Sequence, residues 1–504
     1  MIHNFGRNVS FTPEFCLTPR TEAEVLQILE DHRDKRIRVA GRLHSWSEAA
    51  RSDEVLLDLQ LLNSVQIERR AGRVWASVGA GCQIKKLLAD LEQLAKVTTP
   101  SVGLITEQSI AGAIATGTHG SGKHSLSHDI AEIRIATFDP VSGQAVIRTI
   151  EDGPELKAAR CSLGCLGVIL SVGFWCRPQY NVEEHFARYT TIEEVLAAED
   201  QYPLQQFYFT PWSWDFFVQH RREVQSPRSR LAGLYRLYCL LNLDICTHLS
   251  VIALAQFLRS RRCIHIFFRR ILPLAVVRNW KVVDRSYRML TMKHELFRHI
   301  EIEVFVKRSR LSAALTFVEQ LLRYADGDEH AFSDTVRDQL LQHGLWESLA
   351  PLRGRFTYHY VICVRKVLPD ETLISMASSD DEPYYAMSFI SFARTDERDG
   401  FFCFAKCLAD CLVALDAGRP HWGKVCPLTA AQADALYPHL PEFRRIAHDF
   451  DESGQFQNDW VAKVLFGRSD QRKGDPSSVH DQRPPQSPHR DHAENETSGV
   501  SGLA

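Results

Sequence analysis

Small residues accumulate in one short stretch, "AGAIATGTHGSGKHS" at 111–125, and this stretch constrains the fold more than any other. It holds four glycines and scarcely a bulky side chain. Glycine weakens helix and strand interiors, so such a run is expected where something large must lie close to the main chain. Two further glycine-rich places, "VAGRLHSWS" (39–47) and "VGAGC" (78–82), occur in the same part of the sequence. Together the three loops predict a binding site for a large ligand.

The chemistry of bare backbone narrows the class of ligand. Exposed N–H groups can reach phosphate oxygens, and a flat ring can stack directly on glycine main chain. None of the three loops has the strand–GxGxxG–helix layout of a Rossmann unit, so a nicotinamide dinucleotide is not the first interpretation. Loops contributed by separate strands favour a long ligand with a pyrophosphate at one end and a ring at the other.

A length of 504 residues predicts two or three domains. Residues 1–178 contain short strands with a few helices, and 179–425 contain longer helices interleaved with strands. Within the second block, an arginine-rich apolar insertion occupies about 226–290. Residues 426–467 form a short closing segment, and 468–504 have the composition of a disordered tail.

Several local elements are predicted by their periodicity and turn residues. Apolar spacing indicates a helix at 21–35 with Thr21 as its N-cap, and a second helix at 308–325. The Asp-Pro and Ser-Gly pairs within 131–150 indicate a hairpin. An alternating apolar run indicates a strand at 356–368.

Charge and cysteine content exclude several classes of protein. A net charge of -3 gives no reason to expect a nucleic-acid partner. Thirteen cysteines are scattered without CxxC spacing, so we expect neither a disulfide framework nor a metal site, and a reducing compartment fits better. The N-terminal residues lack the apolar run of a secretory signal. We therefore expect a cytoplasmic or peripherally membrane-associated protein.

The apolar insertion leaves two interpretations open. Its longest uncharged run, 245–258, is shorter than the roughly 20 residues that cross a bilayer. The wider segment 231–277 mixes large apolar residues with arginines. It fits buried amphipathic helices whose arginines face water, and it also fits a basic amphipathic surface in peripheral contact with a membrane.

Six stretches, in order, resemble one known group of proteins. "VAGRLHSWS", "VWASVGAGCQIKKLLADL", "SVGLITEQSIAGAIATGTHGSG" and "CSLGCLGVILSVGF" resemble the FAD-binding domain of the vanillyl-alcohol-oxidase flavoprotein superfamily. "RPHWGK" (419–424) and "DESGQFQNDWVAKVL" (451–465) resemble closing motifs of its aldonolactone and alditol oxidase group, which includes gulonolactone and arabinonolactone oxidases. The resemblance implies an α+β, two-domain PCMH-type fold with an α+β cap domain that carries the substrate site.

The resemblance also implies site residues. His44 matches the histidine that bonds covalently to the flavin 8α carbon, and Lys424 matches a lysine near flavin N1. His421 and Trp422 would lie near the ring. The remaining matches to residues around FAD are Gly41, Arg42, Ser45, Trp46, Ser109, Gly112, Thr116, Gly117, His119, Gly120, Gly164 and Val168.

The implied activity is oxidation of a CH–OH group in an aldonolactone or polyol, by hydride transfer to flavin N5. Arg365, Lys424 and His421 would be the catalytic residues, and oxygen would be the acceptor, giving hydrogen peroxide. One departure from the group's pattern concerns the substrate. Cys363 stands where the group carries a glutamate that contacts sugar hydroxyls. A thiol cannot accept a charge-assisted hydrogen bond as a carboxylate does. A less polar alcohol therefore becomes more credible. Glu303 is either a site residue or part of one polar face of a strand.

Two alternatives stay open. The first is a membrane-associated FAD dehydrogenase that oxidises a less polar alcohol with another electron acceptor. The second is a flavin-binding protein without sugar-oxidase activity.

Overall fold

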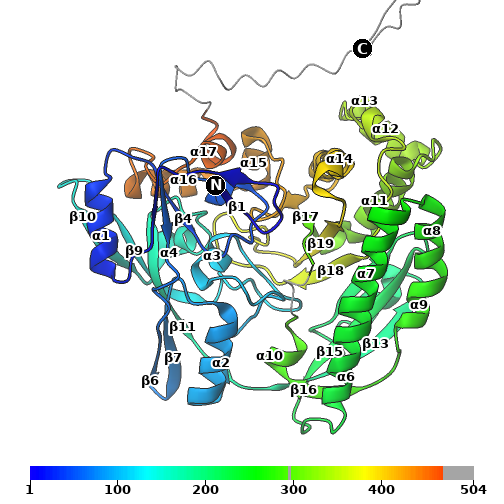
Figure 1. Cartoon of the computed structure of the whole chain (residues 1–504), viewed down its shortest axis with the longest axis horizontal. Coiled ribbons are helices and arrows are strands. Elements are labelled where there is room, and N and C mark those ends of the chain that lie inside the picture. The colour runs from blue at the N-terminus through cyan, green and yellow to red at the C-terminus, as the bar shows by residue number, and fades with distance from the viewer. Residues whose placement is uncertain (293–296, 469–504) are drawn as a thin grey trace, which may run out of the picture. The chain divides into compact units, whose positions relative to one another are not determined.

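The computed structural model describes residues 1–292 and 297–468. The tail predicted for 468–504 lies outside the described residues from 469 onward. Strands from the N-terminal third form small sheets, and later strands form one large sheet, with helices packed against both (Figure 1).

Two sheets carry the glycine-rich loops. Three parallel strands lie in the order β3 (Phe15–Leu17), β5 (Val55–Asp58), β4 (Ile37–Ala40). Five antiparallel strands lie in the order β10 (Ala145–Ile150), β9 (Ile130–Phe138), β11 (Val168–Trp175), β7 (Arg73–Gly79), β6 (Val65–Arg70). The antiparallel pair β9–β10 confirms the hairpin predicted at 131–150.

The helices of this region are α1 (Glu22–Asp31), α2 (Ile84–Ala95), α3 (Ile110–Ala115) and α4 (Gly153–Ala159). Thr21 caps α1 as predicted, because its Oγ1 accepts a hydrogen bond from the Glu24 amide at 3.2 Å. Residues 32–35, also predicted as helix, lie beyond the last turn of α1.

Two glycines are required by close approaches of the backbone. A Cβ on Gly81 would lie 1.8 Å from the Leu59 carbonyl oxygen. Gly122 has a φ of +72°, and a Cβ there would lie 1.8 Å from the Pro203 carbonyl oxygen. Part of the glycine content therefore lets separate chain segments pack against one another.

An eight-stranded sheet forms the second part of the fold. Its order is β16 (Val282–Arg285), β13 (Asn181–Tyr189), β15 (Asp215–Val224), β14 (Gln206–Thr210), β18 (Ile362–Val367), β19 (Tyr384–Ser391), β17 (Ile300–Lys307), β20 (Arg419–Pro420). The strand expected at 356–368 is shorter than predicted. Its first residues form an irregular segment in which the Tyr358 carbonyl accepts a hydrogen bond from Trp212 Nε1 at 3.0 Å.

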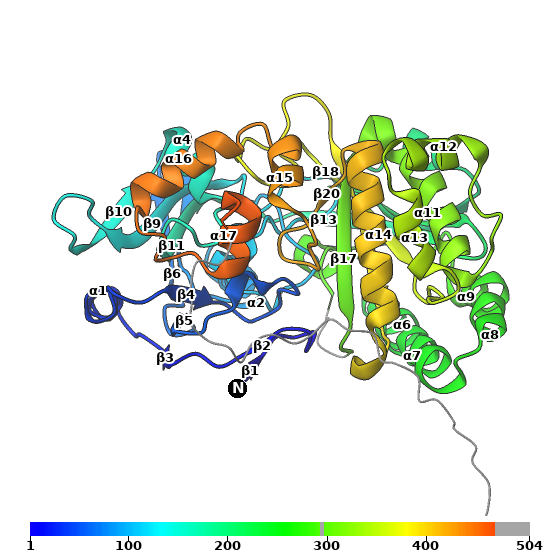
Figure 2. The same cartoon turned by 90° about the horizontal axis from the view of Figure 1, so that it is seen from above.

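Residues alternate strictly between the two faces of this sheet. Val304, Val364 and Met387 pack in the core that includes α11 (Leu311–Asp326) and α14 (Asp399–Asp416). Figure 2 shows α14 running alongside β17. Phe305 and Val367, on the other face of the sheet, pack in the core of the N-terminal sheets instead. One face of the large sheet therefore points toward the glycine-rich loops.

The arginine-rich insertion forms a helical hairpin. Its first arm is one helix, Ala232–Leu258, which contains α6 (Ala232–Tyr238) and α7 (Thr247–Ile252); the second arm contains α8 (Arg261–Ile266) and α9 (Leu272–Ala275). Tyr238 Oη and Asn242 Nδ2 join the arms by donating to the Ala275 carbonyl at 2.8 and 2.7 Å.

By length and composition, the first arm is the one helix among the described residues that could cross a membrane. It is 27 residues long, and its most apolar 18-residue window has a mean hydropathy of 1.7 and is 6% buried. The uncharged run at 245–258 underestimated its length, because the helix extends through Asp244 back to Ala232.

The closing segment returns to the N-terminal sheets. It contains α15 (Ala430–Leu436), α16 (Leu440–Phe450) and α17 (Asp459–Phe466), and Figure 2 shows α16 and α17 over those sheets. The buried Arg38 guanidinium donates to the Phe456 and Leu163 carbonyls. Chain segments more than 400 residues apart are thereby fixed together.

Candidate active site

A cavity of about 320 Å³ lies where the glycine-rich loops meet the eight-stranded sheet. Its wall includes main chain that follows β4, β5 and β7, together with α3 and the turn before β11. The opposite wall comes from the eight-stranded sheet and the inner side of the helical hairpin. The cavity therefore has one end of bare backbone and another of side chains.

The bare-backbone end fits an extended ligand such as FAD. A Cβ on Gly41 would lie 2.3 Å from Ser109 Oγ and 3.8 Å from the Gly112 Cα. The loop at 39–47 and the segment that begins α3 can therefore touch here only because Gly41 has no side chain. Gly164, which has a φ of +76°, adds a further bare position on the cavity wall. The exposed main chain of these loops can donate N–H groups to a pyrophosphate and leaves space for a flat ring to stack on it.

The loop that carries His44 is fixed to the loop that carries Lys424. Leu43 has a φ of +53°, which turns the chain so that His44 faces the cavity and stacks on Phe5, with ring centroids 5.0 Å apart. Ser45 Oγ and the Trp46 amide both donate to the Gly423 carbonyl, at 3.1 and 2.8 Å. Two motifs far apart in sequence thus meet at one end of the cavity.

Most residues expected around FAD line this cavity. Those present on its wall are Gly41, Arg42, His44, Ser45, Trp46, Ser109, Gly112, Thr116, His119, Gly164 and Lys424. The wall does not include Gly117, Gly120 or Val168. Gly117 has a φ of +72°, a Cβ on Gly120 would lie 2.3 Å from the Val102 carbonyl oxygen, and Val168 is buried in the sheet core.

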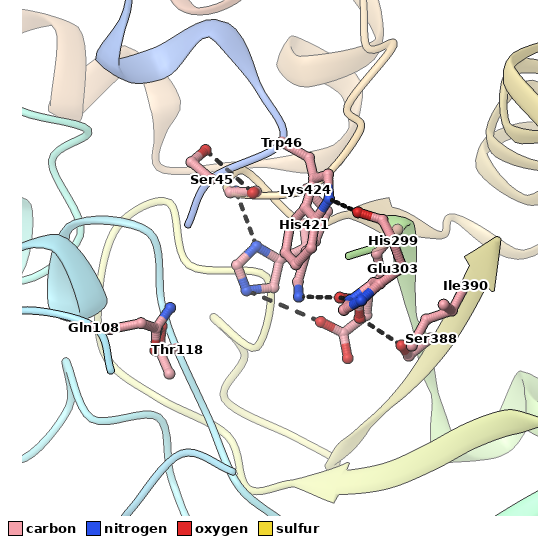
Figure 3. A network of polar contacts seen from close by, with 12 residues as sticks. Ser45, Trp46, Gln108, Thr118, His299, Glu303, Ser388, Ile390, His421 and Lys424 are labelled. Atoms are coloured by element: carbon pink, nitrogen blue, oxygen red, sulfur yellow. Dashed lines mark hydrogen bonds and ion pairs between the residues drawn. The ribbon is translucent and has the colours of Figure 1, made fainter. Parts of the chain in front are cut away.

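Glu303 lies at the centre of the polar part of the cavity. Its Oε1 accepts a hydrogen bond from Arg365 Nη2 at 2.5 Å, and its Oε2 lies 3.5 Å from His119 Nε2 and 4.0 Å from His421 Nε2. Figure 3 shows Glu303 and His421 facing the same space as Lys424. Burial alone would raise the pKa of Glu303, but the charge of Arg365 outweighs it and holds that pKa well below its usual range.

A second carboxylate, Glu301, lies beside the first. It forms an ion pair with Lys424, accepts a hydrogen bond from Ser388 Oγ, and lies 3.8 Å from His299 Nε2. Burial would raise the pKa of Glu301, but Lys424 and His299 hold it below its ordinary value. The Lys424 ammonium also lies 4.2 Å from the centroid of the Trp46 ring. Both carboxylates are therefore ionised and matched by cations.

Hydrogen bonds assign the protons of the two histidines. His421 Nδ1 accepts from the Gly423 amide at 2.9 Å, so its proton is on Nε2, and burial lowers the pKa of His421 to about 3. His119 Nδ1 lies 3.0 Å from the Gly120 carbonyl, which can only accept, so this nitrogen carries a proton. Its Nε2 faces Glu303 Oε2 at 3.5 Å.

One register row crosses five strands of the large sheet and lines the cavity from end to end. Glu303 pairs with Ser388, Ser388 with Cys363, Cys363 with Tyr208, and Tyr208 with Phe217. The row begins with a carboxylate and a hydroxyl and ends with two aromatic rings. Burial raises the pKa of the Cys363 thiol to about 11, so an uncharged group lies at its middle.

The far end of the cavity is predominantly apolar. Phe186, Phe217 and Val276 form a cluster with the half-buried Leu243, and all four line the cavity. Leu243 and Val276 lie on and just after the two arms of the hairpin, which therefore form part of the wall. Asp244 also lies here, where burial raises its pKa to about 6.

The sequence missed part of this arrangement. Glu301, His299 and Ser388 were not expected as site residues, although the alternating acids of "EIEVFVK" were a signal for two carboxylates on one strand face. Trp422 was expected near the ring. It is not on the cavity wall; it is fully buried, stacks on Tyr437 and donates to the Ile374 carbonyl at 2.7 Å.

Comparison with known proteins is consistent with this geometry. A family model described as D-arabinono-1,4-lactone oxidase matches residues 174–464, and one described as FAD binding domain matches 13–139. A long-chain alcohol oxidase from an uncultured marine euryarchaeote is 51% identical over 462 residues, covering 92% of this chain and 96% of the relative. The L-gulonolactone oxidase of Scyliorhinus torazame is 26% identical over 475 residues, covering 92% and 98%.

Solved structures show the same fold. Cholesterol oxidase from Brevibacterium sterolicum has a TM-score of 0.69 at 14% identity, with 92% of this chain and 96% of that chain covered. Fold and matches define the class as an FAD-linked oxidase of CH–OH groups, which confirms the expected two-part α+β fold and the FAD cofactor. Within that class, the chain belongs to the D-arabinono-1,4-lactone oxidase family.

Proposed function

We propose that this chain oxidises the hydroxyl of a long-chain aliphatic alcohol to the carbonyl, with oxygen as acceptor and hydrogen peroxide as the second product. The observation that carries the proposal is the register row from Glu303 to Phe217. Its polar end suits a hydroxyl group, and its uncharged middle and aromatic end suit an alkyl chain. The name of the 51% identical relative supports the same substrate class.

The substrate hydroxyl would bind at the polar end of the row. Arg365 Nε is buried and has no hydrogen-bond partner among the described residues, so it is a donor available to the substrate oxygen. We propose that His119 Nε2 accepts the hydroxyl proton and that Glu303 stabilises the imidazolium that forms. Arg365 and Lys424 would stabilise negative charge on the substrate oxygen while the carbonyl forms.

The cofactor would lie along the bare-backbone end of the cavity. When bound there, FAD would supply the acceptor for the hydrogen and the two electrons that leave the substrate carbon. We propose that Gly41, Ser109 and Gly112 hold its pyrophosphate region and that His44 attaches it covalently. Lys424 would place positive charge beside the ring, with Glu301 and Trp46 holding the ammonium in position.

The polar cluster also has the spacing of a cation site. Ligand atoms of His119, Glu303 and His421 lie within 4.8 Å of one another. Glu303 is already paired with Arg365, however, and Lys424 adds further positive charge to the same space. We therefore propose substrate binding and proton transfer for this cluster, with no metal.

A sugar lactone or polyol is the second candidate substrate. The family match and the two ionised carboxylates, Glu301 and Glu303, favour it. The two candidates make different demands on the apolar half of the cavity, which a polyol would leave without suitable partners.

Peroxide formation along a series of primary alcohols, from butanol to hexadecanol, tests the proposal. Each methylene buried in the apolar half contributes about 0.8 kcal/mol, so kcat/KM is expected to rise about fourfold per carbon until the cavity is filled. Gulonolactone, arabinonolactone and xylitol serve as the comparison set. A flat chain-length profile together with faster turnover of a lactone or polyol would contradict the proposal.

A further inference from the structure

Exposed apolar side chains are concentrated on the outer side of the helical hairpin. The described residues contain sixteen large hydrophobic side chains that are exposed, and eleven of them lie within 231–277. The eleven are Leu231, Leu234, Leu237, Leu241, Leu249, Phe257, Leu258, Ile266, Ile271, Leu274 and Val277. Leu274 is 85% exposed and Phe257 is 77% exposed. Soluble surfaces rarely carry so dense a cluster without a partner.

The charge around this surface has one sign. Residues 228–281 contain nine arginines and one lysine, against the single acid Asp244. Arg228, Arg259 and Arg261 form ion pairs with acids elsewhere. Arg262, Arg270 and Arg278 are exposed and form no ion pair with any described residue. Their positive charge is therefore available to an anionic partner.

The inner side of the same hairpin belongs to the cavity. Leu243 and Thr247 of the first arm and Leu272 and Val276 of the second lie on the cavity wall. The hairpin is held to the large sheet by Arg269 Nε, which donates to the Trp212 carbonyl at 2.7 Å, and by the Asn279 amide, which donates to the Phe186 carbonyl at 2.8 Å. Figure 1 shows the first arm, with α6 and α7, next to the second arm, with α8 and α9. One thin element thus separates the apolar end of the cavity from the exposed apolar surface.

We propose that the outer face of the hairpin docks on an anionic lipid bilayer and that the alcohol enters the cavity from the lipid beneath it. Amphipathic helices with an apolar face and basic residues on their polar face lie in the headgroup region in this way. Docking rather than spanning follows from the first arm's inner contacts, because crossing the bilayer would remove Leu243 and Thr247 from the cavity wall. The docking itself stands on the hairpin alone; the delivery step rests on the proposed function.

The test is sedimentation of FAD-loaded full-length protein with vesicles of phosphatidylcholine alone or with a third phosphatidylglycerol. Each unpaired arginine near an anionic surface favours binding by about 1 kcal/mol, or about fivefold. Three of them predict roughly a hundredfold preference for the anionic vesicles, which high salt abolishes. Equal binding to both vesicles, or binding to neither, would overturn the proposal.

Matched variants separate docking from general surface effects. L234E and L274E, combined, are expected to reduce binding to anionic vesicles at least tenfold. L341E changes another exposed leucine, on α12 (Asp334–Gln342) outside the hairpin, and should leave binding unchanged. Equal losses from both, or resistance of the wild-type protein to alkaline extraction as expected for a spanning helix, would contradict docking. A dimer in lipid-free solution that L234E/L274E converts to monomer would assign the face to a second copy instead.

Activity distinguishes failure of docking from failure of the proposed function. With a water-soluble alcohol and no lipid, L234E/L274E should turn over at the wild-type rate. With hexadecanol supplied in anionic vesicles, its rate should fall in parallel with its binding. Vesicle binding without turnover of any alcohol would contradict the proposed function but not the docking proposal.

Discussion

Glu303 and Cys363 are both register partners of Ser388, one from each neighbouring strand, so a carboxylate and a thiol lie at the same level of the sheet with one residue between them. Glu303 is ion-paired with Arg365, while burial keeps the Cys363 thiol neutral. The boundary between the polar and apolar halves of the cavity therefore falls at Cys363. We propose that the thiol, in place of the glutamate expected from the resemblance, gives this row room for an alkyl chain.

The first prediction concerns that boundary. C363E places a carboxylate in the path of the alkyl chain, and burying it beside Tyr208 is expected to lower kcat/KM for dodecanol about a hundredfold. Activity on a polyol should rise or stay constant. C363S, which keeps the site uncharged and small, should remain within about tenfold of wild type. Equal effects of the two variants on dodecanol would contradict the assignment of Cys363.

The second prediction concerns the proton acceptor. H119Q removes the imidazole beside Glu303, and kcat is expected to fall by about 10²–10⁴ with little change in KM or in FAD content. H124Q is the control, since His124 donates to the Pro369 carbonyl and is not on the cavity wall. Stopped-flow reduction without oxygen measures the effect on the chemical step. A rate within threefold of wild type for H119Q would exclude His119 as the base.

The third prediction concerns the flavin link. Wild-type protein precipitated with acid should stay yellow, and H44A should release its colour into the supernatant, because the imidazole is the nucleophile such a bond needs. The Phe5 ring that stacks on His44 gives a control: F5L keeps the nucleophile and should keep the colour in the pellet. Colourless wild-type pellets would show that FAD is held without a covalent bond.

The fourth prediction is a pH dependence of stability. His359 is buried, which lowers its pKa from 6.5 to about 4, and its Nε2 accepts a hydrogen bond from the Phe392 amide at 3.0 Å. The unfolded chain takes up a proton below about pH 6.5 while the folded chain stays neutral. Stability is therefore lost as pH falls from about 6.5 to 4, by roughly 1.4 kcal/mol per pH unit.

Urea unfolding at several pH values measures this slope. H359Q should make the slope shallower by about one proton, whereas H330Q, which changes an exposed histidine, should leave it unchanged. An unchanged slope in H359Q would mean that this histidine takes up a proton in the folded protein as well.

Local sequence patterns predicted the elements that depend on neighbours in the chain. The Thr21 cap, the hairpin at 131–150 and the meeting of glycine loops follow from residue type and short spacing. Glu301 and Ser388 were missed because their contact depends on which strands become neighbours in the large sheet, and β17 pairs with β19 across about 80 residues of sequence. Gly117 and Gly120 were expected around FAD because they belong to a motif of the FAD-binding domain. The motif did not indicate that the backbone geometry itself requires glycine at both positions.

The most direct test of the account is anaerobic bleaching of the bound flavin by a panel of substrates in the absence of lipid. We predict rapid bleaching by medium- and long-chain primary alcohols and slow bleaching by gulonolactone, arabinonolactone and xylitol. Because oxygen is absent, the result depends on the donor alone and is independent of the electron acceptor. Faster bleaching by a lactone or polyol than by any alkanol would contradict the account.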